Sequence, residues 1–370
     1  MEPHKVDDKI DLLDNIGPEA RTIKRKKLEL HYELLVRANE KAKRHGRLIQ
    51  QEDIASEVKV IKPIITRDMI KKALSDGQEY LANRFSPNSA WDCAMLISTL
   101  LDIGEDPNSP VIKRTRILLL SKKILTNTGL ESWGHPDDNT PNIFDTSFAA
   151  IALIKLGIKS GSKEDQSIIK NAIDFVKSSR DYYGGWQPKP GREEIDVGAT
   201  SWALVALLTY GLSKTDEDVA RGVKWLKDNQ HDDGGWGDHY KSKNFKKSYV
   251  GRTYDATTAL LMANEAESEN LQRAKRWLIE QHKLLRKTGE IKTWVWGWEG
   301  YKTEDITEND LENTILAVIT LLKLKLNVDS DLIVSGINTI LERRNEASLW
   351  GSNTPRAVLC LNEFCKSDSI

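Results

Sequence analysis

The sequence predicts an all-α protein, an (α/α)6 toroid of six helix-pair repeats with an N-terminal helical extension. Two observations support this prediction. A set of apolar, Gly and Trp positions recurs at a period of roughly fifty residues, which is typical of a repeat protein. Between these motifs, amphipathic stretches alternate with stretches that are apolar nearly all round, as expected for outer and inner helices. Such an alternation closes most simply into a ring.

The repeat is clearest at Arg221-Gly222-x2-Trp225-Leu226-x3-Gln230-x3-Gly234-x-Trp236. The same offsets fit residues 171–186 and 335–350, and more loosely 76–91. A Trp at the same place in every unit is more typical of a wedge between repeats than of a ligand contact. We therefore assign the motif to structure, with its glycines serving close packing and positive φ.

The helical periodicity places each element in turn. Outer helices with one charged face are expected at about 67–84, 110–126, 164–179, 216–229, 268–286 and 329–344. Inner helices are expected at 91–101, 145–156, 199–210, 255–264, 312–322 and 355–364. The toroid thus spans residues 63–370, and residues 1–62 form a separate helical extension.

Acidic residues fall at the expected starts of several inner helices, namely Asp92, Asp145, Asp255 and Glu312, and Asp196 lies just before another. Carboxylates at helix N-termini are stabilised by exposed N–H groups, so each could simply cap its helix. Together they could bind Mg²⁺, which prefers oxygen ligands. A neutral carboxylic acid in an apolar cavity could instead donate a proton.

Composition excludes several classes of protein. The net charge of -1 over 370 residues gives no general attraction to nucleic acid or anionic lipid. Three cysteines without a CxxC pair fit a reducing compartment. The first residues are too charged for a signal peptide, and no apolar run is long enough to span a bilayer. We therefore expect a soluble cytoplasmic protein.

Residues 21–47 hold ten Lys/Arg against three Glu, with a thin apolar stripe. Such a stretch is usually a solvated helix on the outside of its own domain, and a protein partner bound through this basic helix is the alternative. No aromatic residues interleave with the charges, so no nucleic-acid partner is expected.

The motif ending at Trp236 resembles the QW motif of squalene cyclases and other class II terpene cyclases. The predicted toroid is also similar to that of protein prenyltransferase β subunits, and the resemblance covers about residues 65–366. Class II cyclases protonate their substrate with the central Asp of a DxDD motif. Here Asn142-Ile143-Phe144-Asp145 and Arg252-Thr253-Tyr254-Asp255 are the nearest matches, and both lack that central Asp. The resemblance implies catalytic roles for Asp145 and Asp255.

Residues 184–196 resemble the prenyltransferase stretch that binds a prenyl diphosphate and zinc. Lys189 and Arg192 match the basic pair that holds the diphosphate, and Asp196 matches the metal-binding Asp. Gly198 replaces the zinc-binding Cys and Asp255 replaces the His. Zinc favours N and S ligands, so no metal site of this type is predicted; Mg²⁺ is the cofactor that the remaining carboxylates could bind.

The long connection from Trp236 to Tyr254 adds basic residues, including Arg252, that could help Lys189 and Arg192 to bind a diphosphate. A solvated basic loop is the alternative. Phe148, Trp202 and Tyr254 are predicted to line the cavity wall, where aromatic faces suit carbocations. A segment at 293–300 with Trp294, Trp296 and Trp298 would also present aromatic surface, with burial in the core as the more common alternative for such side chains.

Three functions remain open at this point. The first is a cyclase- or prenyltransferase-like toroid that binds and processes an isoprenoid diphosphate. The second is a toroid that has lost catalysis and serves as a scaffold for a protein or small ligand. The third is an (α/α)6 glycoside hydrolase, which needs two carboxylates at a defined separation.

Overall fold

A computed structural model of the chain describes residues 66–134, 140–160, 163, 165–189, 191, 194–238, 247–287, 290–296, 308–345 and 349–367. The chain divides into two units: Met1–Lys62 with Leu284–Lys292, and Pro63–Lys283 with Thr293–Ile370. The predicted extension at residues 1–62 lies outside the described residues and stays a prediction. Strands β4 (Lys283–Lys287) and β5 (Glu290–Val295) pair in a two-stranded sheet.

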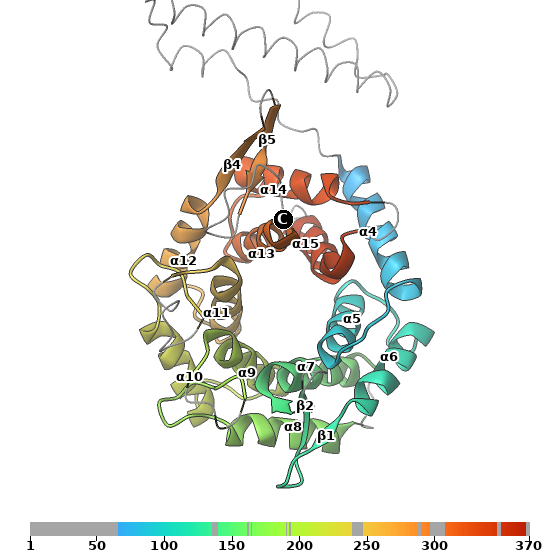
Figure 1. Ribbon diagram of the computed structural model, residues 1–370, viewed down its shortest axis with the longest axis vertical. Coiled ribbons are helices and arrows are strands. Elements are labelled where there is room, and N and C mark those ends of the chain that lie inside the picture. Colours follow the sequence, from blue (N-terminus) through green and yellow to red (C-terminus); the bar gives the residue numbers. More distant parts are fainter. Residues whose placement is uncertain are drawn as a thin grey trace, which may run out of the picture. The chain divides into compact units, whose positions relative to one another are not determined.

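The larger unit is a ring of helices in two concentric layers (Figure 1). The inner layer consists of α5 (Ala90–Asp102), α7 (Ile143–Ser160), α9 (Val197–Tyr210), α11 (Val250–Met262), α13 (Glu308–Lys323) and α15 (Thr354–Ser367). The outer layer consists of α4 (Arg67–Asn83), α6 (Pro110–Ser121), α8 (Gln166–Ser178), α10 (Glu217–Asp228), α12 (Glu269–Glu280) and α14 (Asp331–Glu342). The predicted (α/α)6 toroid is confirmed.

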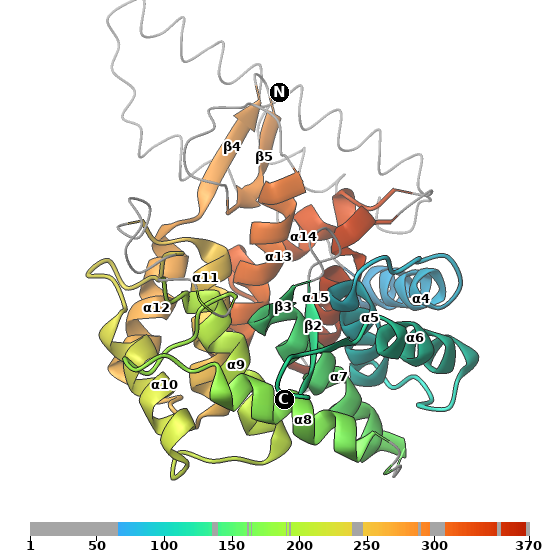
Figure 2. The same ribbon diagram turned by 60° about the horizontal axis from the view of Figure 1, so that its bottom comes forward.

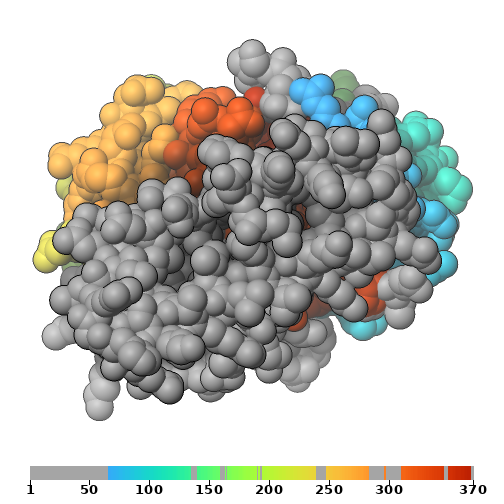
Figure 3. Space-filling view, turned by 90° about the horizontal axis from the view of Figure 1, so that it is seen from above, coloured from blue at the N-terminus to red at the C-terminus, as the bar shows by residue number. Residues whose placement is uncertain are grey.

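Each inner helix contacts the next one along the chain, and the last, α15, contacts the first, α5. The first outer helix, α4, packs on α15, so the two ends of the repeat array meet and close the ring. Figure 2 shows the outer helices wrapped around the inner layer. In the space-filling view of Figure 3, α12 in orange and α4 in blue lie at opposite sides.

A small sheet follows α6. Strands β1 (Ile124–Leu125), β2 (Glu131–Gly134) and β3 (Pro141–Asn142) form it in that order, and both pairings are antiparallel. The sheet leads the chain directly into α7 and places Trp133 of β2 in the core.

Five Trp residues, one before each inner helix from α7 to α15, are buried between helix layers, as the wedge interpretation predicts; Trp91, at the end of the loosest repeat, is not among them. The indole Nε1 donates to a carbonyl near the end of the preceding outer helix at 2.6–2.8 Å. The pairs are Trp133 with Leu119, Trp186 with Val176, Trp236 with Leu226, Trp296 with Leu278 and Trp350 with Ile340. A buried indole keeps its N–H satisfied in this way, so the wedge costs no unpaired donor.

The backbone N–H of each of these Trp residues donates to the hydroxyl of a Thr, which ties the loop to the following inner helix. Trp236 N lies 3.1 Å from Thr253 Oγ1 and Trp186 N lies 2.9 Å from Thr200 Oγ1. Trp296 therefore belongs to the structural set, and its indole is fully buried. The expectation that Trp296 presents an aromatic surface is wrong; the side chains of Trp294 and Trp298 lie outside the described ones.

Glycines let three of the wedges, Trp186, Trp296 and Trp350, approach the next outer helix closely. A Cβ on Gly222 would lie 2.7 Å from Trp186 Cζ3, and a Cβ on Gly77 would lie 2.4 Å from Val358 Cγ2 and 3.5 Å from Trp350 Cζ3. The contact at Gly77 closes the ring, since it joins the first outer helix to the last repeat. Arg344 reinforces it with an ion pair to Asp76 at 2.9 Å.

Candidate functional site

Of the five acidic residues predicted near inner-helix starts, Glu312 lies inside α13 and pairs with Arg356 of α15; the other four comprise three with local contacts and one exception. Asp92 completes a capping box with Ser89 at the start of α5. Asp196 is the N-cap of α9 and accepts from Ala199 N at 2.7 Å. Asp145 accepts from Asn142 Nδ2 at 2.6 Å, while its own N–H donates to Asn142 Oδ1 at 2.7 Å. All three therefore engage local groups of the kind that the capping alternative predicts.

Asp255 is the exception. Helix α11 begins at Val250, five positions earlier than predicted, so Asp255 lies inside the helix. Its carboxylate accepts from two side chains: Trp202 Nε1 of α9 at 2.9 Å and Arg252 Nη1 at 2.8 Å. Burial raises the pKa of Asp255, whereas Arg252 and Trp202 act to lower it.

Arg252 is the cationic centre of this cluster. Its Nε donates to Asp238 at 2.7 Å and its Nη1 to Asp255, and the charge of Asp196 also acts on it. Burial acts to lower the pKa of Arg252, but the carboxylates dominate and raise it. One guanidinium is therefore shared by three carboxylates. Because of this sharing, Arg252 lowers the pKa of Asp255 by less than burial raises it.

The guanidinium has room because of Gly198. A Cβ at this position would lie 2.9 Å from Arg252 Nη1 and 2.9 Å from Phe144 Cζ. Gly198 stands where the prenyltransferase pattern has its zinc-binding Cys. A larger side chain at this position would displace Arg252. Within the described residues, no group of three or more His, Cys, Asp or Glu side chains is arranged to hold a metal ion.

Four aromatic side chains from four consecutive inner helices follow one another around the ring. Trp91 of α5 meets Phe148 of α7 edge to face, with ring centroids 6.1 Å apart. Phe148 lies 4.2 Å from Trp202 of α9, and Trp202 lies 6.3 Å from Tyr254 of α11. We call these four residues the aromatic row. Phe148 is buried, and the other three are partly exposed.

The two remaining inner helices place a cation at each end of the aromatic row. Arg356 of α15 lies over the Trp91 ring, with its Cζ 4.9 Å from the centroid, and pairs with Glu312 of α13 at 2.6 Å. Lys323 of α13 lies 5.9 Å from the centroid of the Tyr254 ring. All six inner helices therefore contribute to one belt of aromatic and cationic groups.

Charges act across this belt. The pKa of Tyr254 is raised to about 12, first by burial and then by Asp255, while Arg356 on α15 lowers it. Arg356 also lowers the pKa of Asp255. Helices α11 and α15 are separated by α13 in the ring, so the side chains must point toward a shared interior for these effects to occur.

The predicted residues Phe148, Trp202, Tyr254, Arg252 and Asp255 thus come together. The structure places Lys189 in the α8–α9 loop, where the preceding residue, Pro188, accepts from Ile143 N at the start of α7. Arg192 lies outside the described residues, as do residues 239–246 of the basic connection.

Sequence reasoning missed Asp238, Lys323 and Arg356 as members of the site, and grouped Trp91 with the repeat motif. Trp91 lies in the first turn of α5 and has no wedge role. The sequence does contain one indication that Trp91 belongs to the site: Trp91 directly precedes Asp92, just as Tyr254 directly precedes Asp255. A single Lys or Arg on an inner helix carries no comparable signal.

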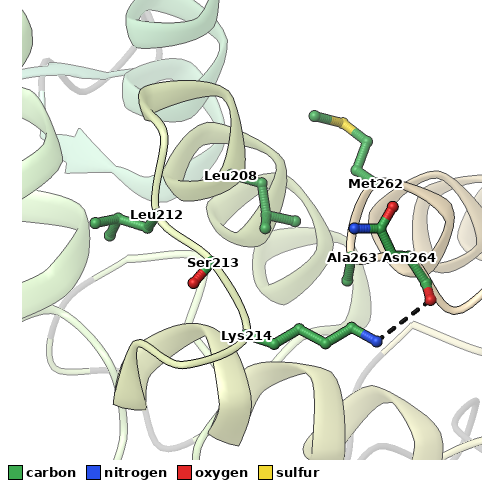
Figure 4. Close-up of a pocket in the computed structure, with 7 residues that line it drawn as sticks. All are labelled: Leu208, Leu212, Ser213, Lys214, Met262, Ala263 and Asn264. Atoms are coloured by element: carbon green, nitrogen blue, oxygen red, sulfur yellow. Dashed lines mark hydrogen bonds between the residues drawn. The ribbon is translucent and has the colours of Figure 1, made fainter.

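A small pocket of about 190 Å³ lies at the other ends of α9 and α11 (Figure 4). Leu208, Leu212 and Met262 supply apolar surface, and the amine of Lys214 donates to Asn264 O at 3.3 Å. Lys214 also pairs with Glu265. The amine therefore serves to bridge two repeats, and the pocket lies at the ends of α9 and α11 opposite those that carry Asp196 and Arg252.

Comparison with known proteins supports the class of fold. Residues 139–304 match the family model for the squalene-hopene cyclase C-terminal domain. Squalene–hopene cyclase of Zymomonas mobilis is 22% identical over 313 residues, which cover 74% of this chain and 45% of that protein. The Bradyrhizobium diazoefficiens enzyme is 23% identical over 77% of this chain and 47% of its own length.

The chain thus spans about half the length of the curated relatives it matches. A GH76 α-mannanase of Bacteroides thetaiotaomicron has a TM-score of 0.57 at 12% identity, over 82% of this chain and 96% of that one, which shows a common fold alone. The resemblance to the terpene-cyclase toroid superfamily is confirmed. Among the helices that the structure describes, none has the length and apolarity to cross a membrane.

Proposed function

We propose that this toroid binds an isoprenoid diphosphate inside the ring, with the hydrocarbon chain against the aromatic row. The aromatic row itself is the observation that supports the proposal. Four aromatic faces in succession offer a long apolar surface, and burial of such surface is the main source of affinity for a prenyl chain. The relationship to squalene–hopene cyclases supports the same class of ligand.

For the head group, the proposed contacts are Lys189, Arg192 and Arg252. Arg can bind phosphate oxygens through two donors at once, which favours a diphosphate over a single charge. Arg252 already serves Asp238 and Asp255, so a phosphate there would compete with two ion pairs. Mg²⁺ between the diphosphate and rim carboxylates would lower that competition, and it remains a proposed cofactor.

For chemistry, Asp255 is the proposed acid, with Asp145 and Asp196 at the other two rim positions. Its carboxyl contacts Trp202 and so lies beside the aromatic row. Burial favours its protonated form, as proton donation to an alkene requires. The cation formed would be stabilised by the faces of Trp202 and Tyr254. Asp196 caps α9 by accepting from Ala199 N, and Asp145 holds Asn142, whose amide oxygen accepts from Asp145 N at the start of α7, so we assign both to holding these helices in place.

The second candidate is a scaffold without catalysis, which would bind a protein or a small ligand, for example through the basic N-terminal helix. The ion pairs favour it, because Asp255 and Glu312 each already have an Arg partner. A glycoside hydrolase is the third candidate, which the shared fold with the α-mannanase keeps open.

Calorimetry with geranylgeranyl diphosphate, with and without Mg²⁺, tests the proposal against both alternatives. We expect saturable binding to wild type, weakened roughly ten- to hundredfold in Arg192→Ala, since one charge-assisted contact is lost. Trp202→Ala should weaken binding as well, whereas Tyr182→Ala, on a side chain that is 81% exposed, serves as the control. Undetectable binding to wild type contradicts the proposal, and hydrolysis of an α-1,6-mannan oligosaccharide would favour the third candidate.

A further inference from the structure

Four partly buried cationic side chains are described on the inner helices, and three have carboxylate partners. Lys155 pairs with Asp102 at 2.8 Å, Arg252 with Asp238 and Asp255, and Arg356 with Glu312. Lys323, the last residue of α13, differs from them. Among the residues that the structure describes, no carboxylate oxygen lies within 4.0 Å of its amine, and its closest charged or aromatic contact is the Tyr254 ring.

Lys323 points into the ring. The Tyr254 ring lies on α11, and the carboxylates that act on the Lys323 amine, Glu363 and Asp102, lie on α15 and α5. The amine of Lys323 lies 5.9 Å from the Tyr254 ring centroid, so it faces the neighbouring inner helix α11. Lys323 is thus the one inner-wall cation of these four that faces the shared space with its hydrogen-bonding capacity uncommitted to a carboxylate.

Its surroundings hold the pKa of Lys323 below the ordinary value of a lysine amine. Burial lowers the pKa of Lys323, while Glu363 and Asp102 act to raise it. On the outer side, Lys275 of α12 donates to Leu324 O and Lys325 O at the end of α13, so it adds a further positive charge near this helix end. A buried amine without a close counter-ion is unfavourable when charged, and an incoming anion would remove that penalty.

We infer that Lys323 binds the anionic phosphate group of an amphipathic ligand inside the ring, while the aromatic row contacts the ligand's apolar chain. The inference rests on the proposed isoprenoid site and gives its charged end a second candidate position. Lys323 is the last residue of α13, whereas Arg252 lies in the first turn of α11, so a phosphate at Lys323 is an alternative to the head-group contacts proposed above. Lys323 can form this contact without breaking an ion pair, whereas Arg252 would have to leave Asp238 or Asp255.

The inference has a signature that a structural lysine lacks. An anion beside Lys323 raises the affinity of the amine for its proton, so binding should be accompanied by proton uptake from the buffer. Proton uptake is measured by calorimetry at one pH in buffers of different ionisation enthalpy. We expect this uptake to increase as the pH is raised, because the lowered pKa leaves a growing share of the free amine neutral.

The test uses the full chain, two ligands and three variants. Geranylgeranyl diphosphate and inorganic pyrophosphate are titrated into wild type, Lys323→Met, Lys323→Arg and the control Lys224→Met, whose lysine is exposed on α10 and pairs with Asp228. We expect Lys323→Met to bind both ligands roughly ten- to hundredfold more weakly, without proton uptake. Lys323→Arg should keep affinity without uptake, because its guanidinium is always charged. Thermal melting verifies that each variant is folded.

The outcomes separate this inference from the proposed function. If Lys323→Met binds geranylgeranyl diphosphate as wild type does, with unchanged proton uptake, the inference is overturned and the isoprenoid site stands. If pyrophosphate binds through Lys323 and the prenyl chain adds no affinity, the inference stands and the isoprenoid site fails. If neither ligand binds to wild type, both are overturned.

Discussion

The indole Nε1 of Trp202 lies 2.9 Å from the carboxylate of Asp255 and donates a hydrogen bond to it across the contact between α9 and α11. This bond joins the aromatic row to the charged rim. The indole N–H is the polar group of a largely apolar side chain, and here it holds the Asp255 carboxyl group beside the aromatic row. The cluster of Arg252 with its three carboxylates lies directly beside it.

The raised pKa of Asp255 predicts how its removal changes stability with pH. An acid whose folded-state pKa lies above its unfolded value, about 3.9, stabilises the fold below that value and loses this contribution as pH rises through the folded pKa. Asp255→Asn has no such loss. We therefore expect the free energy of unfolding of Asp255→Asn, relative to wild type, to increase from about pH 3 toward neutral pH and then level off.

Urea denaturation over this pH range measures the difference, with Asp106→Asn, on an exposed turn, as the charge-matched control. The opposite slope would mean that Arg252 outweighs burial and holds Asp255 ionised.

Trp236→Ala should destabilise the fold by about 3–5 kcal/mol, because it removes a large aromatic from a fully buried wedge. It also leaves Leu226 O without the indole donor. Chemical denaturation measures the loss, and Tyr182→Ala on the surface should change stability little. If Trp236→Ala unfolded like wild type but no longer bound ligand, the assignment of the motif to structure would be wrong.

Two glycine substitutions should have opposite effects. Gly222→Ala should destabilise by about 1–3 kcal/mol, because the new methyl would meet Trp186 at 2.7 Å and Leu204 at 2.9 Å. Gly251→Ala meets no atom within 4 Å and should stabilise α11 by up to about 1 kcal/mol. Melting temperatures decide this. Equal effects would show that helix propensity, and not the wedge, governs Gly222.

Deletion of residues 1–60 should leave a folded toroid, because the closing contacts of the ring come from α4 and α15. Circular dichroism of the truncated protein checks for a cooperative thermal transition. Loss of that transition would show that the N-terminal segment completes the core.

The fold could be predicted from the sequence because each helix pair carries its own periodicity. Every helix predicted for the toroid is present, most within a few residues of its expected bounds. The largest errors fall at the end of α6, at the start of α11 and at the end of α12. The capping residues there, Lys122, Tyr249 and Gln281, are not types that signal a helix boundary in a sequence.

The site was harder to predict because its members meet only when the ring closes. Arg356 contacts Trp91 across the junction between the last and first repeats, which no local pattern reveals. Trp133 and Trp296 escaped the repeat search because strands precede them and alter the spacing. Asp255 was found through family resemblance, but its partners were found only in the structure.

The most direct test of the central claim is electron density in crystals soaked with geranylgeranyl diphosphate at saturating concentration. The account predicts a prenyl chain in contact with the rings of Trp91, Phe148, Trp202 and Tyr254, with its phosphate group near Lys323. A ligand ordered elsewhere on the protein, or a ring interior filled by the same side chains with no ligand after soaking, would contradict it.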